Sequence, residues 1–355
     1  QPLDFFHQRS VLGHGNLGLT QSTNSPDIIQ CAFASTGFAE PMPHGIQDAL
    51  LIYNPTSGTR RHRRFAEIEQ AVRNLKEHGI AVELAATTAG GSATGIARQA
   101  VNQRRGMVIA CGGDGTINEI INGLAGSQVP MALLPAGTAN ILAKELGIPW
   151  DIPHASRLIS EGVIRRIALG LATSTNGAHS ADLPPEGRYF LSVAGAGPDG
   201  AIVNAVNGEL KKRAGVLAYW AEGARQLFSY NFPEMRVQSN GHERRASIIV
   251  VGRTVNYGGP FKITTGASLF EDSFEFLTNA TRSRLRYLAC LPALWLGKLR
   301  NMHGIEAWKH TEVTCESANG AKVFAQVDGE PIGSLPLKFR IVPDALSLLT
   351  PATLK

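Results

Sequence analysis

A glycine-rich turn between two apolar segments constrains the fold of this chain more than any other feature. It lies in Met107–Glu119, with the sequence Met-Val-Ile-Ala-Cys-Gly-Gly-Asp-Gly-Thr-Ile-Asn-Glu. The apolar run stops at Gly112 and a new apolar-periodic segment starts at Ile117, which predicts a strand, a tight turn and a helix. Glycines let a ligand approach the backbone of such a turn, and the first free N–H groups of the helix favour a phosphate there.

Two acids in this stretch are candidate functional residues. Asp114 would stand at the carboxyl edge of the strand, where open α/β sheets bind their ligands. Because the turn needs no carboxylate for its geometry, we expect a functional role for Asp114. Glu119 leaves two interpretations open, since Thr116 and Glu119 also have the Thr-x-x-Glu spacing of a capping box that stabilises a helix start without any ligand.

The pattern of strand, turn and helix occurs four times between residues 47 and 160. Apolar runs at 49–53, 81–86, 107–111 and 131–134 each lead through a turn into a helical pattern. This alternation predicts a parallel sheet covered by helices. The four turns would then share one edge of the sheet and converge on one ligand.

Length and composition indicate more than one domain. The chain has 355 residues, of which 43% are hydrophobic and 18% charged, which is enough for two cores. Short β-type runs dominate from 161 to 344, interrupted by helical patterns at about 215–228 and 282–300, and they predict a second, β-rich domain. Residues 1–46 predict a loosely ordered extension. Within it, Gly13-His-Gly-Asn-Leu-Gly18 matches a dinucleotide-binding pattern in its letters only, because no strand precedes it.

Charge and cysteine content exclude some classes of partner. The net charge of +5 and the pI of about 9.1 suit anionic ligands or an anionic surface. No basic motif interleaved with aromatic residues supports nucleic-acid binding. The four cysteines are scattered, without metal-ligand spacing, and favour a reducing, cytoplasmic environment. The longest apolar run, 287–297, contains Pro292 and is too short to span a membrane.

Four motifs, taken together and in this order, resemble the diacylglycerol-kinase catalytic family, which includes diacylglycerol, sphingosine and ceramide kinases and bacterial lipid kinases. The motifs are Asn54-Pro-x-Ser-Gly58, Gly112-Gly-Asp-Gly-Thr-x-Asn-Glu119, Leu134-Pro-x-Gly-Thr-x-Asn140 and Val327-Asp-Gly-Glu330. The resemblance implies an α/β nucleotide-binding domain of the NAD-kinase/phosphofructokinase type over 47–160, with a parallel sheet. It also implies that the β-rich domain over 161–344 is a β-sandwich that takes the lipid substrate, with ATP in the cleft between the domains. A last strand near 345–350 would return to the first domain.

The resemblance places ATP against the turns that follow the four strands. Carried over position by position, its contacts are Asn54, Pro55, Thr56, Ser57, Gly58, Thr87, Gly112, Gly113, Asp114, Gly115, Thr116, Ile117, Asn118, Glu119, Gly137, Thr138 and Asn140. For Asn54, Pro55 and Asn140 a structural role in a turn or helix cap stays open. The run 60–64, Arg-Arg-His-Arg-Arg, is interpreted as a solvated helix start beside the phosphates.

The resemblance also assigns the catalytic base and a metal site. Glu330 would accept the proton of the lipid hydroxyl, while Asp114 would serve the nucleotide and its magnesium. Asp272, with the carbonyl groups of Leu269 and Phe274, would hold a Mg²⁺ ion.

Three departures from the family pattern bear on these assignments. Ser273 stands where the family usually has a glycine, and Ile141 and Ala168 stand where it often has acids. The network of acids around a metal is therefore thinner in this chain. The segment 195–199, Gly-Ala-Gly-Pro-Asp, is expected to form a turn that faces the other domain, with its glycines serving either packing or a ligand.

The helical pattern at 282–300 has a layout suited to a membrane surface. Cationic residues bracket an apolar stretch; they are Arg282, Arg284, Arg286, Lys298 and Arg300. This layout favours peripheral contact with an anionic membrane, from which a lipid substrate would be collected. A core helix whose cationic ends reach into solvent is the alternative.

Three functions compete on this sequence. The first is an ATP-dependent lipid kinase that transfers the γ-phosphoryl group to the hydroxyl of a diacylglycerol- or sphingoid-type lipid. The second is an NAD-kinase-like or phosphofructokinase-like enzyme, since those families also use a Gly-Gly-Asp-Gly turn. The third is a nucleotide- or lipid-binding regulator with weak or no catalysis. The identity of the lipid stays open, because acyl-chain pockets are built from interchangeable apolar residues. A homodimer is possible and also stays open.

Overall fold

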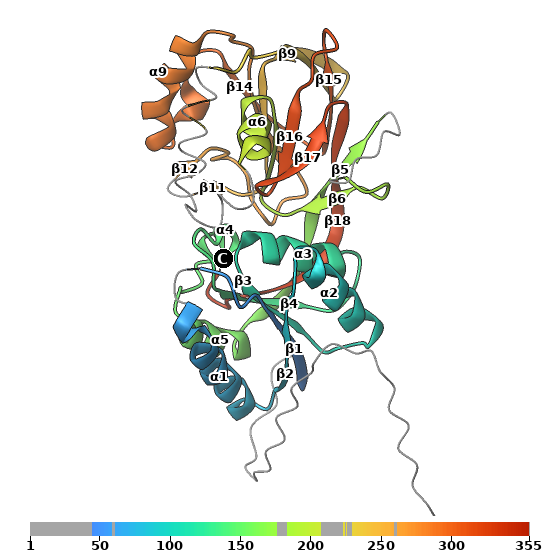
Figure 1. The fold of residues 1–355 in the computed structure, drawn as a ribbon, viewed down its shortest axis with the longest axis vertical. Coiled ribbons are helices and arrows are strands. Elements are labelled where there is room, and N and C mark those ends of the chain that lie inside the picture. Colours follow the sequence, from blue (N-terminus) through green and yellow to red (C-terminus); the bar gives the residue numbers. More distant parts are fainter. Residues whose placement is uncertain are drawn as a thin grey trace, which may run out of the picture.

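The protein consists of two lobes, an α/β lobe and a β-rich lobe, which two long strands connect (Figure 1). The computed structural model describes residues 45–58, 61–175, 183–206, 223, 225, 229–258 and 261–354. The predicted extension 1–46, with its pattern at 13–18, and the predicted helix 215–228 lie almost entirely outside the described residues.

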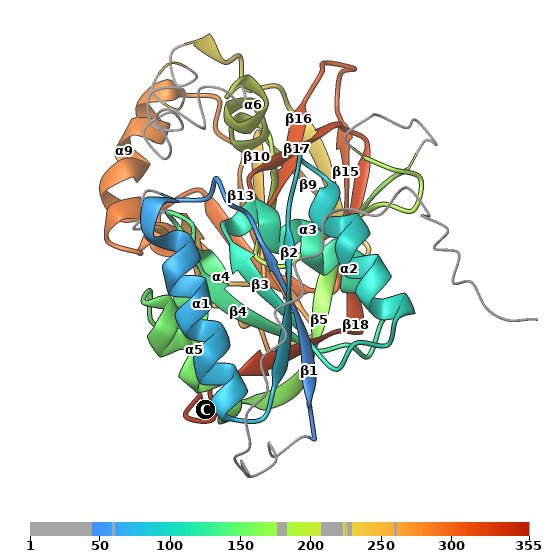
Figure 2. The same cartoon turned by 60° about the horizontal axis from the view of Figure 1, so that its bottom comes forward.

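The α/β lobe alternates strands and helices as the sequence predicts. Its elements are β1 (Asp48–Tyr53), α1 (Arg61–Glu77), β2 (Ala81–Ala86), α2 (Ser92–Asn102), β3 (Val108–Gly112), α3 (Asp114–Leu124), β4 (Met131–Pro135), α4 (Ile141–Glu145) and α5 (Ile152–Ser160). The strands lie in the order β2-β1-β3-β4, and all their pairs are parallel. Every residue of β3 and β4 is buried, because helices cover both faces of the sheet. Figure 2 shows α1 beside α5 and α2 beside α3.

Two long antiparallel strands run from one lobe into the other. They are β5 (Val163–Ser174) and β18 (Leu337–Thr350), and they pair from Val163↔Thr350 to Ser174↔Leu337. Near its end β18 also lies parallel to β4, with Leu348 opposite Met131. The chain therefore returns to its first lobe at the C-terminus, as the resemblance implies.

The β-rich lobe is a sandwich of two sheets. The first continues from β18 through β15 (Glu312–Ser317) and β8 (Met235–Ser239) to β9 (His242–Ala246), and β6 (Arg188–Phe190) pairs with β5. The second has the order β14 (Ile305–His310), β13 (Phe274–Asn279), β10 (Ile248–Gly252), β7 (Val193–Ala196), β16 (Phe324–Val327) and β17 (Glu330–Ser334). Aromatic rings fill the space between the sheets; Phe190 stacks on Phe274 at 5.6 Å between ring centroids and meets Phe339 edge-on.

The predicted fold class is confirmed, while several elements were missed. The smaller elements of the β-rich lobe are α6 (Pro198–Ala205), β11 (Asn256–Gly258), β12 (Phe261–Lys262), α9 (Arg284–Trp295) and a 3₁₀ turn at Leu299–Asn301. The sequence did not predict α5, α6, β9, β11, β12, β14 or β17. All of these except α5 have eight residues or fewer, and so short a segment shows little periodicity. Within the described ranges, no helix is long and apolar enough to cross a bilayer.

Candidate active site

Three of the predicted phosphate turns pack against one another at the carboxyl edge of the parallel sheet. A Cβ atom on Gly137, after β4, would lie 2.5 Å from the Cα of Gly113, after β3. Gly58, after β1, has a φ of +68°, and a Cβ atom there would overlap the carbonyl oxygen of Ala136. Only glycine fits these contacts, so the three turns form one continuous backbone surface.

Asn140 joins two of these turns from inside the protein. It is fully buried with a φ of +41°, its Nδ2 donates to the carbonyl of Gly112 at 2.9 Å, and its Oδ1 accepts from the N–H of Gly137 at 2.6 Å. Its side chain makes no helix-cap bond. Of the two interpretations of Asn140, the geometry favours a structural role, because a buried side chain shapes the turns rather than touching a ligand.

Asn54 and Thr116 connect the turn after β1 to the start of α3. The Oδ1 of Asn54 accepts from the N–H and the hydroxyl of Thr56, each at 2.9 Å, which is the bonding of an Asx turn. Its Nδ2 donates to the Thr116 hydroxyl at 3.3 Å. Side chains of the predicted motifs therefore hold the turns after β1 and β3 together.

Glu119 stabilises a different helix from the one predicted. Helix α3 already begins at Asp114, so Thr116 lies inside it, and the capping box, one of the two interpretations of Glu119, does not form. Instead the Glu119 carboxylate accepts from the N–H of Ala93 at 3.1 Å, in the first turn of α2. The negative charge of Glu119 also interacts favourably with the positive end of the α2 dipole.

Arg64 is buried, contrary to the prediction of a solvated helix start. Its Nη2 donates to the Ala136 carbonyl at 3.0 Å, which brings a positive charge to the turn after β4. His62 and Arg63 are exposed as expected. Helical spacing could have predicted this burial, because Arg64 lies on the same face of α1 as the buried Ile68 and Leu75.

Asp114 lies at the start of α3 and faces the cleft between the lobes. Its Oδ1 accepts from the main-chain N–H of Ile141 at 2.7 Å. Burial raises the pKa of Asp114 above its ordinary value, and the nearby Asp328 carboxylate raises this pKa further, while the Ile141 N–H lowers it. Both acids line one small cavity together with Asn118 and Ser192.

The fourth motif forms a tight hairpin between β16 and β17. Val327 pairs with Glu330, and the two loop residues have positive φ angles, +46° at Asp328 and +77° at Gly329. These are the values of a type I′ turn, for which Asp-Gly is a preferred sequence. Glu330 follows this turn as the first residue of β17.

Four N–H groups hold the Asp328 carboxylate. Its Oδ1 accepts from Ser192 and Val193 at 2.9 Å, and its Oδ2 accepts from Leu191 and from the Nδ2 of Asn118 at 2.8 Å. Burial raises the pKa of Asp328, and these four donors oppose the rise. Asn118 belongs to α3 of the α/β lobe, so this carboxylate ties the hairpin to both lobes.

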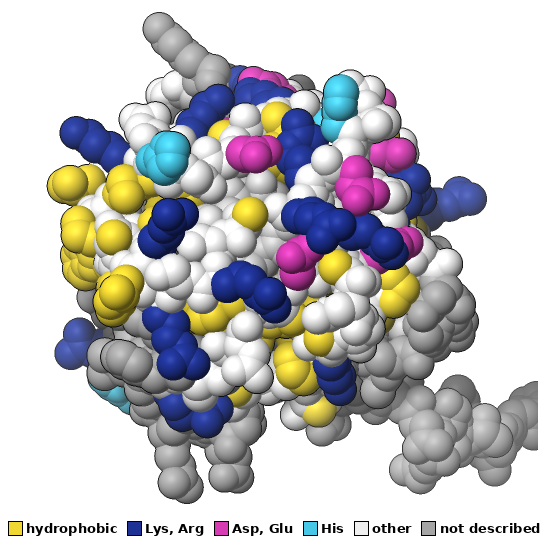
Figure 3. Space-filling view, turned by 90° about the horizontal axis from the view of Figure 1, so that it is seen from above, with side chains coloured by type: hydrophobic (Ala, Val, Ile, Leu, Met, Phe, Trp, Pro, Cys, Tyr) yellow, Lys and Arg dark blue, Asp and Glu magenta, His cyan; other side chains and the backbone are white. Residues whose placement is uncertain are grey.

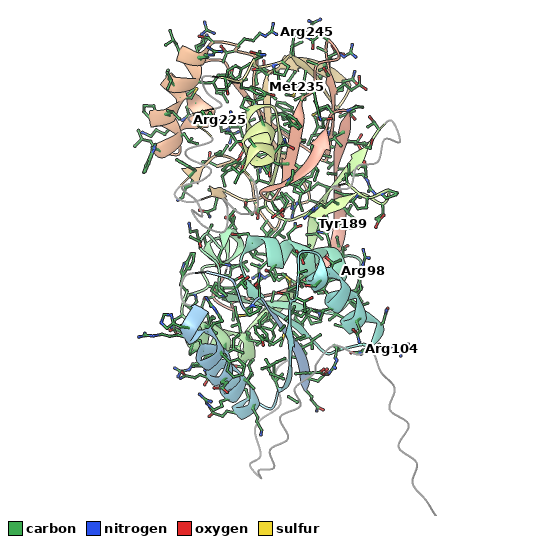
Figure 4. The ribbon with its side chains drawn as sticks, in the orientation of Figure 1. Arg98, Arg104, Tyr189, Arg225, Met235 and Arg245 are labelled. Atoms are coloured by element: carbon green, nitrogen blue, oxygen red, sulfur yellow. The ribbon has the colours of Figure 1, made fainter. Side chains whose placement is uncertain are left out.

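A second clamp lies beside the first, at Tyr189 of β6. Figure 4 shows Tyr189 at the junction of the two lobes. Its main-chain N–H donates to the Oδ1 of Asn122 at 2.9 Å, and its carbonyl accepts from the Nδ2 atoms of Asn122 and Asn118 at 2.9 and 3.2 Å. The β-rich lobe is thus fixed to the same helix, α3, that carries the phosphate turn at its start.

The hairpin brings Glu330 to the glycine turn. The Oε1 of Glu330 lies 3.3 Å from the position that a Cβ atom on Gly115 would occupy. Asp114 and Glu330 come from sequence positions more than two hundred residues apart, yet they flank the same helix start. A substrate hydroxyl beside Glu330 would therefore be close to phosphates held by the turns of β3 and β4.

A buried acid that the sequence did not single out supports this hairpin. Asp199 of α6 accepts from the Nε2 of Gln326 at 2.8 Å and from the hydroxyl of Tyr257. Gln326 in turn accepts from the N–H of Gly329 at 2.8 Å. Burial raises the pKa of Asp199 to about 6. A Cβ atom on Gly195 would collide with the Asp199 carboxylate, so this glycine serves packing.

The loop predicted to hold magnesium already contains a cation of the protein. The guanidinium group of Arg253 donates to the carbonyl of Leu269 at 2.7 Å and to that of Glu271 at 3.0 Å. Leu269 is one of the three predicted ligands, with Asp272 and Phe274. Over the described ranges no group of three or more His, Cys, Asp and Glu residues could hold a metal ion. Because the guanidinium group already occupies the Leu269 carbonyl, an ion bound to this carbonyl would face a positive charge.

The predicted ATP contacts divide into accessible and buried residues. Exposed or half-buried are Asn54, Pro55, Thr56, Ser57, Gly58, Thr87, Gly113, Asp114, Gly115, Glu119, Gly137 and Thr138. Buried are Gly112, Thr116, Ile117, Asn118 and Asn140. Contact between ATP and the first group stays a prediction, whereas the residues of the second group lie inside the protein.

The chain is similar to known proteins over both lobes. Residues 48–172 match the diacylglycerol kinase catalytic domain, and residues 192–350 match the YegS C-terminal NAD kinase beta sandwich-like domain. A diacylglycerol kinase of Bacillus subtilis (strain 168) is 30% identical over 296 residues, 82% of this chain and 92% of that protein. A diacylglycerol kinase of Staphylococcus aureus (strain MRSA252) is 29% identical over 82% of this chain and 88% of its own length. The solved structure of a diacylglycerol kinase from Bacillus anthracis str. Sterne has a similar fold, with a TM-score of 0.63, 19% identity, and coverage of 87% of this chain and 98% of that one.

Proposed function

This chain belongs to the diacylglycerol kinase catalytic-domain family, and we propose that it transfers the γ-phosphoryl group of ATP to the hydroxyl of a diacylglycerol- or sphingoid-type lipid. The curated relatives are named diacylglycerol kinase, so the chain is a lipid kinase, and diacylglycerol is the first substrate to test. The observation that carries the proposal is the position of the Glu330 carboxylate against Gly115, at the start of the helix that follows the glycine-rich turn.

The turns would bind the nucleotide through their main chain. Gly58, Gly113 and Gly137 add no side chains of their own to this surface, and N–H groups at the start of a helix such as α3 attract phosphate. Arg64 adds a fixed positive charge next to the turn after β4. A magnesium ion bound with the nucleotide would neutralise charge on the transferred phosphoryl group, and Asp114 is the acid at this turn that would face it.

Glu330 would act as the general base. Phosphoryl transfer depends mainly on positioning and electrostatics, and the attacking hydroxyl must lose its proton as the reaction proceeds. The Glu330 side chain starts from a tight hairpin that Asp328 and Gln326 fix in place, so its carboxylate has a defined position relative to Gly115. One well-placed carboxylate is sufficient for the proton transfer.

Substitution of Glu330 tests this role. We expect Glu330→Gln to keep the fold and ATP affinity and to lower turnover on the order of 10²- to 10⁴-fold. The exposed Glu161, at the end of α5, gives the matched control Glu161→Gln, which should retain full turnover. Turnover is measured with labelled ATP, magnesium and a panel of diacylglycerol, sphingoid base, ceramide and NAD.

The results of this panel separate the competing functions. Phosphorylation of a lipid that requires Glu330 supports the proposal. Phosphorylation of NAD but of no lipid indicates the NAD-kinase-like activity instead. Tight ATP binding without transfer to any acceptor indicates a binding regulator.

We also propose that α9 brings the enzyme to an anionic membrane. Helix α9 is not a core helix, since Ala293 is its one buried residue, and the apolar side chains of Leu285, Trp295 and Leu296 are 77%, 61% and 70% exposed. Figure 3 shows hydrophobic side chains gathered on the side of the molecule that carries α9, with Lys and Arg around them. Tyr287 anchors the helix, because its hydroxyl bonds to Ser247 at 2.9 Å.

An apolar helix face with cations at its ends suits insertion into the headgroup region of an anionic bilayer. We expect Leu285→Ser combined with Leu296→Ser to reduce co-sedimentation with vesicles of phosphatidylglycerol and phosphatidylcholine. Phe65→Ser, at an exposed apolar residue of α1, is the control and should bind as the wild type does. Binding that ignores both anionic lipid and salt would contradict this part of the proposal.

A further inference from the structure

Arg253 is the largest side chain that the described protein buries completely, and its burial needs an explanation. It directly follows β10 and has no exposed surface. A buried cation is costly unless hydrogen bonds and opposite charge compensate it. Burial lowers the pKa of Arg253 to about 10, and the Asp272 carboxylate opposes this change. The side chain therefore stays positively charged at neutral pH inside the lobe.

The acceptors around this cation are oxygen atoms of one loop. Nη2 of Arg253 donates to the Leu269 carbonyl and Nη1 donates to the Glu271 carbonyl, with Asp272 next in the chain. Main-chain carbonyls and a carboxylate are the oxygen ligands that magnesium and calcium also take. A divalent ion at the Leu269 carbonyl would lie beside the guanidinium group, and the two positive charges would repel each other.

We propose that the guanidinium group of Arg253 takes the place of a metal ion in the loop 269–274, so that this loop keeps its shape without magnesium. The inference does not depend on which lipid is phosphorylated. It replaces the expectation that Asp272 binds an ion, and it assigns Asp272 the role of a counter-charge to Arg253.

The loop matters because it connects the lobes. Leu269 packs into the core of the α/β lobe, and the guanidinium group of Arg165 lies 5.2 Å from the ring centroid of Phe270. The main-chain N–H of Arg253 donates to the Ser192 carbonyl at 2.8 Å, and the N–H of Ser192 donates to Asp328. A fixed internal cation would hold the loop 269–274 in place at any magnesium concentration. Through Ser192 it would also hold the hairpin of β16 and β17.

The first experiment measures thermal unfolding of the full chain without nucleotide, in EDTA and in excess MgCl₂. For the wild type we expect the two Tm values to agree within about 1 °C, because an ion that binds nowhere in the folded protein cannot stabilise it. We expect Asp272→Asn to lower the Tm equally in both buffers. The control is Asp344→Asn, at an exposed aspartate of β18, which should not change the Tm.

A magnesium-dependent rise of the wild-type Tm that Asp272→Asn abolishes would place an ion in this loop and overturn the proposal. A rise that Asp272→Asn leaves intact places the ion elsewhere and agrees with the proposal. Hydrogen–deuterium exchange of peptides covering 264–274 gives a local measurement, and we expect the same protection in both buffers. Protection that requires magnesium would again overturn it.

The second experiment removes the cation itself. Arg253→Met keeps much of the side-chain volume but leaves the buried Leu269 carbonyl and the part-buried Glu271 carbonyl without a donor, and it removes the positive charge near the exposed Asp272. We expect the Tm to fall by about 5 to 10 °C and exchange in 264–274 to increase. A variant as stable as the wild type would show that the guanidinium group does not hold the loop. If Arg253→Met does not fold, the Asp272→Asn comparison in the two buffers still decides the question.

Discussion

The carboxylate of Asp328 allows a quantitative test of how the hairpin of β16 and β17 is held. Asp328→Asn is the informative change, because asparagine suits a type I′ turn at least as well as aspartate and the hairpin itself is preserved. The variant removes the negative charge and replaces one acceptor oxygen by an NH₂ group. Any effect then comes from the contacts of the carboxylate, not from the conformation of the turn.

The geometry sets the size of the effect. Each carboxylate oxygen of Asp328 accepts hydrogen bonds from two N–H groups. Whichever oxygen the NH₂ group of asparagine replaces, that NH₂ group faces two N–H donors and can accept from neither. The amide of Asn118 can turn over and relieve one of these clashes, but the N–H of Leu191, Ser192 or Val193 cannot. At least one buried N–H loses its acceptor and the remaining bonds lose their charge. A destabilisation of about 2 to 5 kcal/mol follows.

Urea unfolding of the wild type and the variant measures this difference, which should appear as a lower midpoint with an unchanged slope. Asp344→Asn is a matched control, since Asp344 also has a positive φ angle, +50°, but its side chain is exposed. Its effect should stay within about 0.5 kcal/mol. If Asp328→Asn destabilises the protein no more than Asp344→Asn does, the four N–H groups do not hold the hairpin as the geometry indicates.

Two further predictions concern the surroundings of the hairpin. Gly115→Ala should keep or slightly raise stability, because alanine favours the helix by up to about 1 kcal/mol. It should lower turnover by about tenfold, because the new Cβ would lie 3.3 Å from the Glu330 carboxylate. Steady-state kinetics and thermal unfolding measure the two effects, and unchanged turnover would contradict the contact. Asp199→Asn should change the pH dependence of stability, because the pKa of Asp199 is raised in the folded state from 3.8 to about 6. The contribution of Asp199 is complete below pH 3.8 and is lost as the pH rises through about 6, so the wild type should lose up to about 3 kcal/mol relative to the variant between pH 4 and pH 7. Urea unfolding at a series of pH values measures this, and parallel curves for the two proteins would refute it.

The sequence predicted those parts of the site that local chemistry determines. The turn after β3 could be located because glycines interrupt an apolar run, and the alternation of elements placed that turn on the same edge as Gly137. The Asp-Gly pair of the hairpin carries its own conformational preference for positive φ angles. In each case a short stretch of chain contains both the signal and the structure that it specifies.

The residues that were missed depend on partners far along the chain. Asp199 bonds to Gln326 across 127 positions, and Glu119 accepts from Ala93, in the first turn of α2, across 26 positions. Arg253 is understood only when the loop at 269–271 is folded around it. No periodic pattern records such pairs, because the charge of each residue is compensated by tertiary contacts and not by its sequence neighbours.

The departures at Ile141 and Ala168 are compatible with an active kinase. Ile141 supports Asp114 through its main-chain N–H, which any non-proline residue offers. Ala168 is buried in the core of the sandwich, where an acid would need a partner of its own. A chain with fewer acids near the cleft has less negative charge for a second cation to neutralise, and Arg253 supplies a fixed positive charge beside Asp272 in the loop before β13. The missing acids and the buried arginine are therefore consistent with the proposal that a side chain of the protein supplies the positive charge in the loop 269–274.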